Sequence, residues 1–194
     1  MQQVLVGNVG IAVTTRKQNQ LIMQKQNGFS LIELLIAVAI ILVIAAIAIP
    51  NLLEARKSAN EASAVGSIRE IRSAEFSYYS TYTAVGFALK LGDLGGTSPC
   101  TPSSTTGCLI DNFLATATPG GTGKSGYYFL ATGISSGATL NSEFAIGASP
   151  IEFNRTGNRN FCTTNDGVLR SQPGSTGALP VNDVPPCQAF PIAQ

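Results

Sequence analysis

The run at residues 29–49 is almost entirely apolar, and its only charged side chain is Glu33. A helix of this length measures about 31 Å, which is enough to cross the hydrocarbon core of a bilayer, about 30 Å thick. Its aliphatic side chains favour insertion by more than a single acid opposes it. Because insertion does not need this carboxylate, we expect Glu33 to have a function of its own.

The residues around the start of this run form a recognisable pattern. Lys25 and Gly28 precede it, Phe29 opens it, and Pro50 follows it, within the string KQNGFSLIELLIAVAIILVIAAIAIPNLLEARKSANEA. This string resembles the processing site and N-terminal helix of a type IV prepilin, in which Gly28 would be the last leader residue and Phe29 the new, N-methylated N-terminus. Glu33 lies where the family keeps an acid, and Pro50 where it often keeps a helix-kinking proline. An ordinary single-span anchor would leave these features as coincidences.

The resemblance implies a set of partners. Prepilin peptidase, which is also the N-methyltransferase, would cut after Gly28, and the inner-membrane assembly machinery of the pilus would then extract the subunit from the membrane. Further copies of the chain would pack with it into a helical homopolymer, through a head-to-tail contact that does not close on itself. In that array we expect Glu33 to pair with the amine of Phe29 of a neighbouring subunit.

Flanking charges predict the orientation in the membrane. Arg16, Lys17 and Lys25 precede the span, and Arg56 and Lys57 follow it, so positive charges favour a cytoplasmic N-terminus by three to two. We therefore expect a single-pass precursor in the cytoplasmic membrane, which later joins a surface pilus or, alternatively, a periplasmic pseudopilus. Since the expected cut precedes the apolar run, that run stays in the mature protein.

The leader is predicted to be residues 1–28. Family leaders that are followed by Phe are usually short, so Met23 is a candidate for the true start of translation. A long leader that begins at Met1 is the alternative.

Residues 50–82 are expected to continue the helix as an amphipathic half. Pro50 lacks an amide hydrogen and is expected to bend the helix. Apolar residues recur at steps of three and four and predict one buried face: Leu52, Ala55, Ala59, Ala62, Val65, Ile68, Ile71, Ala74, Tyr78 and Tyr82. Most charged residues lie off this face: Arg56, Lys57, Glu61, Arg69, Glu70 and Arg72.

Residues 83–194 are expected to form a globular head. Strand-like runs occur at residues 127–132, 144–148, 159–162 and 168–170. The turn signal Asn165-Asp166-Gly167 lies between the last two and predicts a hairpin. The expected fold class is α+β, with a long N-terminal helix, half transmembrane (29–49) and half amphipathic (50–82), packed on a small antiparallel sheet as in a pilin.

Four cysteines, all after the span, are typical of an oxidised compartment outside the cytoplasm. Three pairings are possible. We favour Cys100 with Cys108 and Cys162 with Cys187, because each pair encloses a loop with few signals of regular structure. Zinc binding is disfavoured, since the chain has no His and no close cysteine pair.

The composition argues against several functions. The absence of His removes most nucleophile and general-base schemes, so we expect no enzyme, no catalytic residues, no cofactor and no metal site. A formal charge of +1 argues against a nucleic-acid surface spread over the whole chain, which leaves nucleic-acid binding at the level of a filament. Residues 120–125 end like a phosphate-binding loop, but Thr118 stands where that motif needs its first glycine.

Two functions remain. The first is a structural subunit of a type IV pilus, or fimbrium, that serves cell adhesion, twitching motility or DNA uptake. The second is a pseudopilin of a type II secretion system. Two disulfides and a Ser/Thr-rich loop at residues 97–107 favour the surface pilin, while a receptor-like anchored domain would leave the processing motif uncut.

Overall fold

The computed structural model describes residues 28–135, 137 and 140–193, and the chain divides into two compact units, Met1–Leu42 and Val43–Gln194. Lys25, the candidate start Met23 and the rest of the predicted leader before Gly28 lie outside the described residues.

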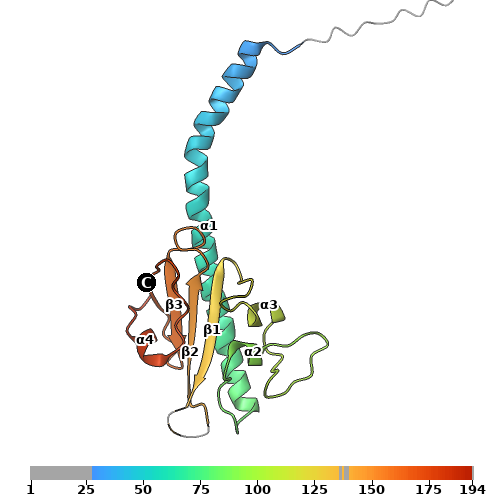
Figure 1. Cartoon of the computed structure of the whole chain (residues 1–194), viewed down its shortest axis with the longest axis vertical. Coiled ribbons are helices and arrows are strands. Elements are labelled where there is room, and N and C mark those ends of the chain that lie inside the picture. Colours follow the sequence, from blue (N-terminus) through green and yellow to red (C-terminus); the bar gives the residue numbers. More distant parts are fainter. Residues whose placement is uncertain (1–27, 136, 138–139, 194) are drawn as a thin grey trace, which may run out of the picture. The chain divides into compact units, whose positions relative to one another are not determined.

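The longest element is α1 (Leu31–Thr81), a single helix that contains the apolar run and the amphipathic half (Figure 1). It begins two residues after Phe29, and the helix is continuous through Pro50. Proline removes one backbone hydrogen bond and need not end a helix whose other turns remain bonded.

The sheet has four strands, β1 (Tyr127–Ile134), β2 (Glu143–Pro150), β3 (Arg159–Thr164) and β4 (Arg170–Pro173), all antiparallel in the order of the chain. The first three lie where the sequence predicts them. The predicted hairpin is confirmed, with Cys162 opposite Arg170.

The position predicted for the fourth strand, residues 168–170, is wrong. The strand begins only at Arg170, because the turn is longer than its sequence signal indicates. Gly167 N–H donates to the carbonyl of Thr164 at 3.0 Å, and Val168 N–H donates to the carboxylate of Asp166 at 2.9 Å. These bonds hold the chain in the turn.

The core lies between α1 and one face of the sheet, within the unit Val43–Gln194. Strand side chains alternate between faces, so every second residue points to the helix. The buried residues of α1 in this core are Ala64, Ile68, Ile71, Ala74 and Tyr78, and those of the sheet are Tyr127, Phe129, Ala131, Phe144, Ile146, Ala148 and Phe161. The α+β architecture predicted from the sequence is therefore confirmed.

The C-terminal segment covers the opposite face of the sheet. It contains α4 (Val184–Gln188), and its buried cluster consists of Cys162, Cys187 and Phe190 with Val181 beside them. Gly147 of β2 allows this close approach, since a Cβ there would lie 2.2 Å from the carbonyl oxygen of Val181. Two short helices, α2 (Leu91–Leu94) and α3 (Asn112–Ala115), lie in the connection between α1 and β1.

The predicted buried face of α1 is only half right. Its later part, Ile68, Ile71, Ala74 and Tyr78, is buried as expected. The earlier part is wrong, because Leu52, Ala55, Ala59 and Ala62 are exposed. Three charged residues are buried on the helix in addition: Lys57, Glu61 and Glu75.

Candidate processing and assembly site

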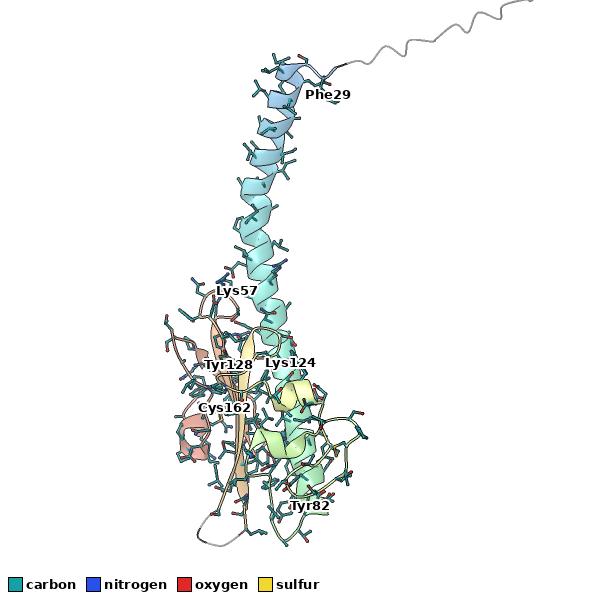
Figure 2. The ribbon with its side chains drawn as sticks, turned by 45° about the vertical axis from the view of Figure 1, so that its right-hand side comes forward. Phe29, Lys57, Tyr82, Lys124, Tyr128 and Cys162 are labelled. Carbon is teal, nitrogen blue, oxygen red and sulfur yellow. A yellow bond between two sulfur atoms is a disulfide. The ribbon has the colours of Figure 1, made fainter. Side chains whose placement is uncertain are left out.

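The segment at residues 28–49 is almost wholly exposed. Phe29 is 81% exposed, and every residue from 28 to 49 except Ala45 is exposed. In Figure 2 the side chains of this part of α1 point outward all round the helix, from Phe29 onward. Among the residues that the structure describes, α1 is the one helix long and apolar enough to cross a membrane.

Glu33 lies in the first turn of α1, where the carboxylate is exposed. The amide of Leu34 donates to the carbonyl of Ser30 at 3.1 Å and closes this turn. A carboxylate near a helix N-terminus interacts favourably with the helix dipole. Within the described part of the chain no cation lies in ion-pair distance of Glu33, so the charge is open to an external partner.

Gly28 has no packing role in the described structure. A Cβ at this position would meet no atom within 4 Å. The packing of the described residues therefore does not require a glycine here.

Comparisons with known proteins match the N-terminal segment of the chain. Residues 23–49 match the family model described as the prokaryotic N-terminal methylation motif. This N-terminal segment is type IV pilin-like. It is 62% identical over 39 residues to a protein of Thermus thermophilus named type IV wide pilus major component PilA4, a match that spans 20% of this chain and 30% of that protein. No solved structure matches the chain.

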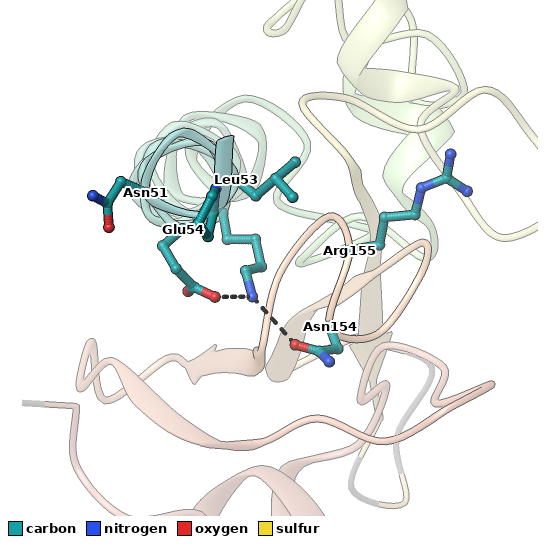
Figure 3. Close-up of a pocket in the computed structure, with 7 residues that line it drawn as sticks. Asn51, Leu53, Glu54, Asn154 and Arg155 are labelled. Atoms are coloured by element: carbon teal, nitrogen blue, oxygen red, sulfur yellow. Dashed lines mark hydrogen bonds and ion pairs between the residues drawn. The ribbon is translucent and has the colours of Figure 1, made fainter. Parts of the chain in front are cut away.

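The pilin-like segment leads into a contact that the sequence did not predict. After Pro50, α1 is held by the loop between β2 and β3, which we call the clasp loop (residues 151–158). The ammonium of Lys57 lies 2.6 Å from the carboxylate of Glu54 and donates to Asn154 Oδ1 at 3.2 Å (Figure 3). Pro50 lines the hollow above this contact, together with Asn51, Leu53, Glu54, Lys57, Asn154 and Arg155.

One turn further along, Glu61 makes a second charged contact with this region. One carboxylate oxygen accepts from the amide of Asn158 at 2.8 Å, and the other accepts from the guanidinium of Arg159 at 2.8 Å. Asn60 adds a bond from its side-chain amide to the carbonyl of Thr156 at 2.9 Å. Lys57 and Glu61 are therefore buried because they are paired, as buried charges must be.

Sequence reasoning missed this contact for a physical reason. Helical periodicity treats a charged residue as solvent-facing. The loop partner of Lys57, Asn154, lies 97 residues further along the chain, and the partners of Glu61 lie 97 and 98 residues further along. The local signals that exist are weak: two charges spaced by four residues, and polar residues clustered in a loop at residues 152–159.

A third buried charge, Glu75, lies in the core of the head. Its Oε2 accepts from the amide of Ala88 at 2.9 Å, and within the described part of the chain Oε1 has no hydrogen-bond partner. Burial raises the pKa of Glu75 from 4.5 to about 8, and the nearby carboxylate of Asp93 adds to the rise, against the lowering by the Ala88 amide. The side chain is therefore mostly neutral at pH 7.

In the hairpin turn, the pKa of a carboxyl group is lowered instead of raised. The guanidinium of Arg170 forms two bonds to Asp166, at 2.6 and 3.2 Å, and lowers the pKa of that carboxyl to about 2. Through its bonds to Arg170 and to the amide of Val168, Asp166 stabilises the turn.

Both disulfides of the structure are those that the sequence favours, Cys100–Cys108 and Cys162–Cys187. The first closes the Ser/Thr-rich loop. The second joins β3 to α4 (Cys162 is labelled in Figure 2). The longer loop is more regular than its sequence indicates, since it contains β4 as well as most of α4.

The loop at residues 120–125 leads into strand β1, as expected, and no helix follows it. Its Lys124 lies 3.5 Å from the carboxylate of Glu70 and 3.9 Å from that of Asp111. The lysine thus pairs with one acid on α1 and one acid in the head.

Proposed function

We propose that this protein is a structural subunit of a type IV pilus, assembled after prepilin peptidase cuts between Gly28 and Phe29. The observation that carries the proposal is the exposed apolar segment at residues 29–49 with Glu33 as its one charge. An unpartnered apolar surface of this extent needs lipid or protein to cover it. A pilin meets that need with lipid first and with neighbouring subunits later.

Before assembly, the chain is a single-pass precursor with a cytoplasmic N-terminus. The flanking charges support this orientation. The open space around Gly28 supports recognition of that residue by the peptidase, because packing within the described chain does not require a glycine there. The new amine at Phe29 is then methylated.

During assembly, neighbouring apolar helices replace the lipid. Glu33 lies four residues beyond Phe29, in the first turn of α1, so the carboxylate of one subunit and the Phe29 amine of an adjacent subunit are expected at similar depth. We propose that the carboxylate of Glu33 pairs with the Phe29 amine of a neighbour. In a surrounding of low dielectric constant, such a pair selects the incoming subunit and sets its register.

A pseudopilin of a type II secretion system is the second candidate. The processing motif itself favours it as much as it favours a pilin. The name of the Thermus thermophilus relative, a major component of a wide pilus, supports the filament. Adhesion, twitching motility and DNA uptake are the roles proposed for such a filament.

Mass spectrometry of fibres sheared from the cell surface tests the proposal. We expect abundant chain that begins at N-methylated Phe29. A Gly28→Val variant is expected to accumulate as uncut precursor in the membrane, whereas Gly66→Val, which changes another glycine with no atom near its missing Cβ, is expected to be cut normally. Processed chain that is absent from sheared fibres and remains with the cell envelope would favour the pseudopilin.

A further inference from the structure

Most charged side chains of the unit Val43–Gln194 are satisfied within it. Nearly all of these side chains form ion pairs. Two more accept a backbone amide: Glu75 from Ala88, and Asp183 from Val184. Within the described residues of this unit, four charged side chains have neither an ion pair nor a hydrogen bond: Arg56, Arg69, Arg72 and Glu143. Three are cations on α1, and the fourth is an acid on β2.

Two of these cations line one hollow, which we call the arginine hollow. Its walls are Ile68, Arg69, Arg72, Thr163, Gly167 and Leu169. Arg72 is held in place there: its guanidinium lies over the ring of Phe76, 5.3 Å from the centroid, and against Gly167, where a Cβ would lie 2.4 Å from Nη2. The glycine of the hairpin turn thus makes room for the guanidinium.

Arg72 also has an unused donor. Its Nε is buried and has no acceptor among the described residues. A buried donor without a partner is costly, and a guanidinium fork is shaped to bind a carboxylate through two bonds. The nearest turn carboxylate, Asp166, is already bound to Arg170. The guanidinium of Arg72 therefore has no carboxylate partner among the described residues.

Glu143 of the same molecule does not reach the hollow. Its neighbours on β2, Phe144 and Ile146, belong to the core beneath α1, so alternation places Glu143 on the face of the sheet away from the helix. Thr163 of the hollow has the same parity as the core residue Phe161, which places it on the helix side. Glu143 and the arginine hollow thus lie on opposite faces of the sheet.

We propose that the arginine hollow of one copy binds Glu143 of a second copy. This inference rests on the proposed function and adds a contact between heads to it. Complementary groups on opposite faces make a heterologous contact, which propagates from copy to copy and does not close into a dimer. Among the described residues of the head, Glu143 is the one acid that is free to serve as the partner.

A charge exchange in the full chain tests the pairing. We expect Arg72→Glu and Glu143→Arg each to lower the amount of sheared fibre by roughly tenfold or more, because each places like charges together. The double variant Arg72→Glu/Glu143→Arg is expected to restore most of it. Arg56→Glu changes the charge equally outside the hollow and is expected to assemble like the wild type. Normal cleavage and the absence of free thiols show that each variant is inserted and folded.

Failure of the exchange to restore fibres overturns the pairing with Glu143, and so does normal assembly of either single variant. An equal loss in Arg56→Glu overturns it too, since net charge would then be the cause. In each of these cases a wild type that still forms fibres leaves the proposed function standing.

A second measurement does not depend on shed fibres. Arg72→Lys keeps the charge and provides an amine, which a carbodiimide couples to a carboxylate in direct contact while the reagent takes up the oxygen as a urea. In membranes or fibres we expect an amide between position 72 and Glu143 of another copy, seen as a dimer band and as the joined peptide in mass spectra. Its absence, or its persistence in Arg72→Lys/Glu143→Gln, overturns the inference.

Discussion

The carboxylate of Glu61 and the guanidinium of Arg159 join α1 to the start of β3, with both Nε and Nη2 at 2.8 Å from one carboxylate oxygen. The other oxygen accepts the amide of Asn158. The helix carries Glu61 inside the head, where the side chain is only 10% exposed, while Arg159 is 47% exposed. This pair is a charged contact between the helix and the sheet region, and Glu61 is buried in it.

Removal of Glu61 is expected to weaken the fold. Glu61→Ala leaves the amide of Asn158 and half-buried Arg159 without their acceptor, so we expect a loss of about 2 kcal/mol in the free energy of unfolding. The matched control is Glu152→Ala, which breaks the pair with Arg155, exposed at 52% and 79%. It is expected to cost less than about 1 kcal/mol. Urea unfolding of the full chain in detergent measures both, and equal losses would contradict a structural role of the buried pair.

Glu75 is expected to make the stability of the head depend on pH. Because the pKa of Glu75 is raised from 4.5 to about 8, the folded state binds more protons than the unfolded state between these values. The free energy of unfolding therefore falls as pH rises from about 4.5 to about 8, by up to about 5 kcal/mol. Glu75→Gln is expected to remove this fall.

Unfolding midpoints at pH 6 and pH 9 measure the effect of Glu75. Glu70→Gln, which removes an acid whose side chain is 45% exposed on the same helix, is the control. A wild-type midpoint that stays constant between pH 6 and pH 9, or a Glu75→Gln variant with the same fall as the wild type, would show that burial does not keep this carboxyl neutral.

The two disulfides are expected to differ in their contribution to stability. Cys162–Cys187 closes a loop of 25 residues and Cys100–Cys108 one of 8. By the chain-entropy model, Cys162→Ser costs about 3.5 kcal/mol and Cys100→Ser about 2.5. Cys162→Ser is also expected to free the thiol of Cys187 and to reduce fibre yield, with insertion and cleavage unchanged.

Thiol alkylation and peptide mapping, together with urea unfolding, test this order. A larger loss in Cys100→Ser would mean that the shorter bridge matters more than its loop length predicts. Impaired cleavage in Cys162→Ser would mean that processing depends on the fold of the head.

Glu33 is expected to act only in assembly. Glu33→Gln keeps the size of the side chain and removes its charge, so the variant should insert and be cut after Gly28. It is then expected to lose roughly tenfold or more of its incorporation into fibres, or its methylation at Phe29. Glu152→Gln, which removes a charge from the clasp loop, serves as the control. Fibres of normal amount that carry methylated Phe29 would exclude the role.

Local sequence predicted the elements of the head well where local forces dominate. The alternation in β1, the run in β2 and the signal Asn165-Asp166-Gly167 each depend on neighbours within a few residues. The predicted start of β4 is wrong, because the carboxylate of Asp166 accepts bonds from Val168 and Arg170 that extend the turn. Side-chain bonds of this kind are not visible in a hydrophobic pattern.

The sequence by itself determined the N-terminal methylation motif, the long apolar helix and the α+β class. Each of these follows from residue types at short spacing, where covalent geometry and the hydrophobic effect act directly. Only the tertiary structure decided which face of α1 is buried after Pro50 and which charges remain unpaired. Those outcomes depend on partners about a hundred residues away, such as Asn158 and Arg159 for Glu61. The free energy of a buried charge is set by the groups that surround it after folding. A local stretch of sequence does not show which groups those will be.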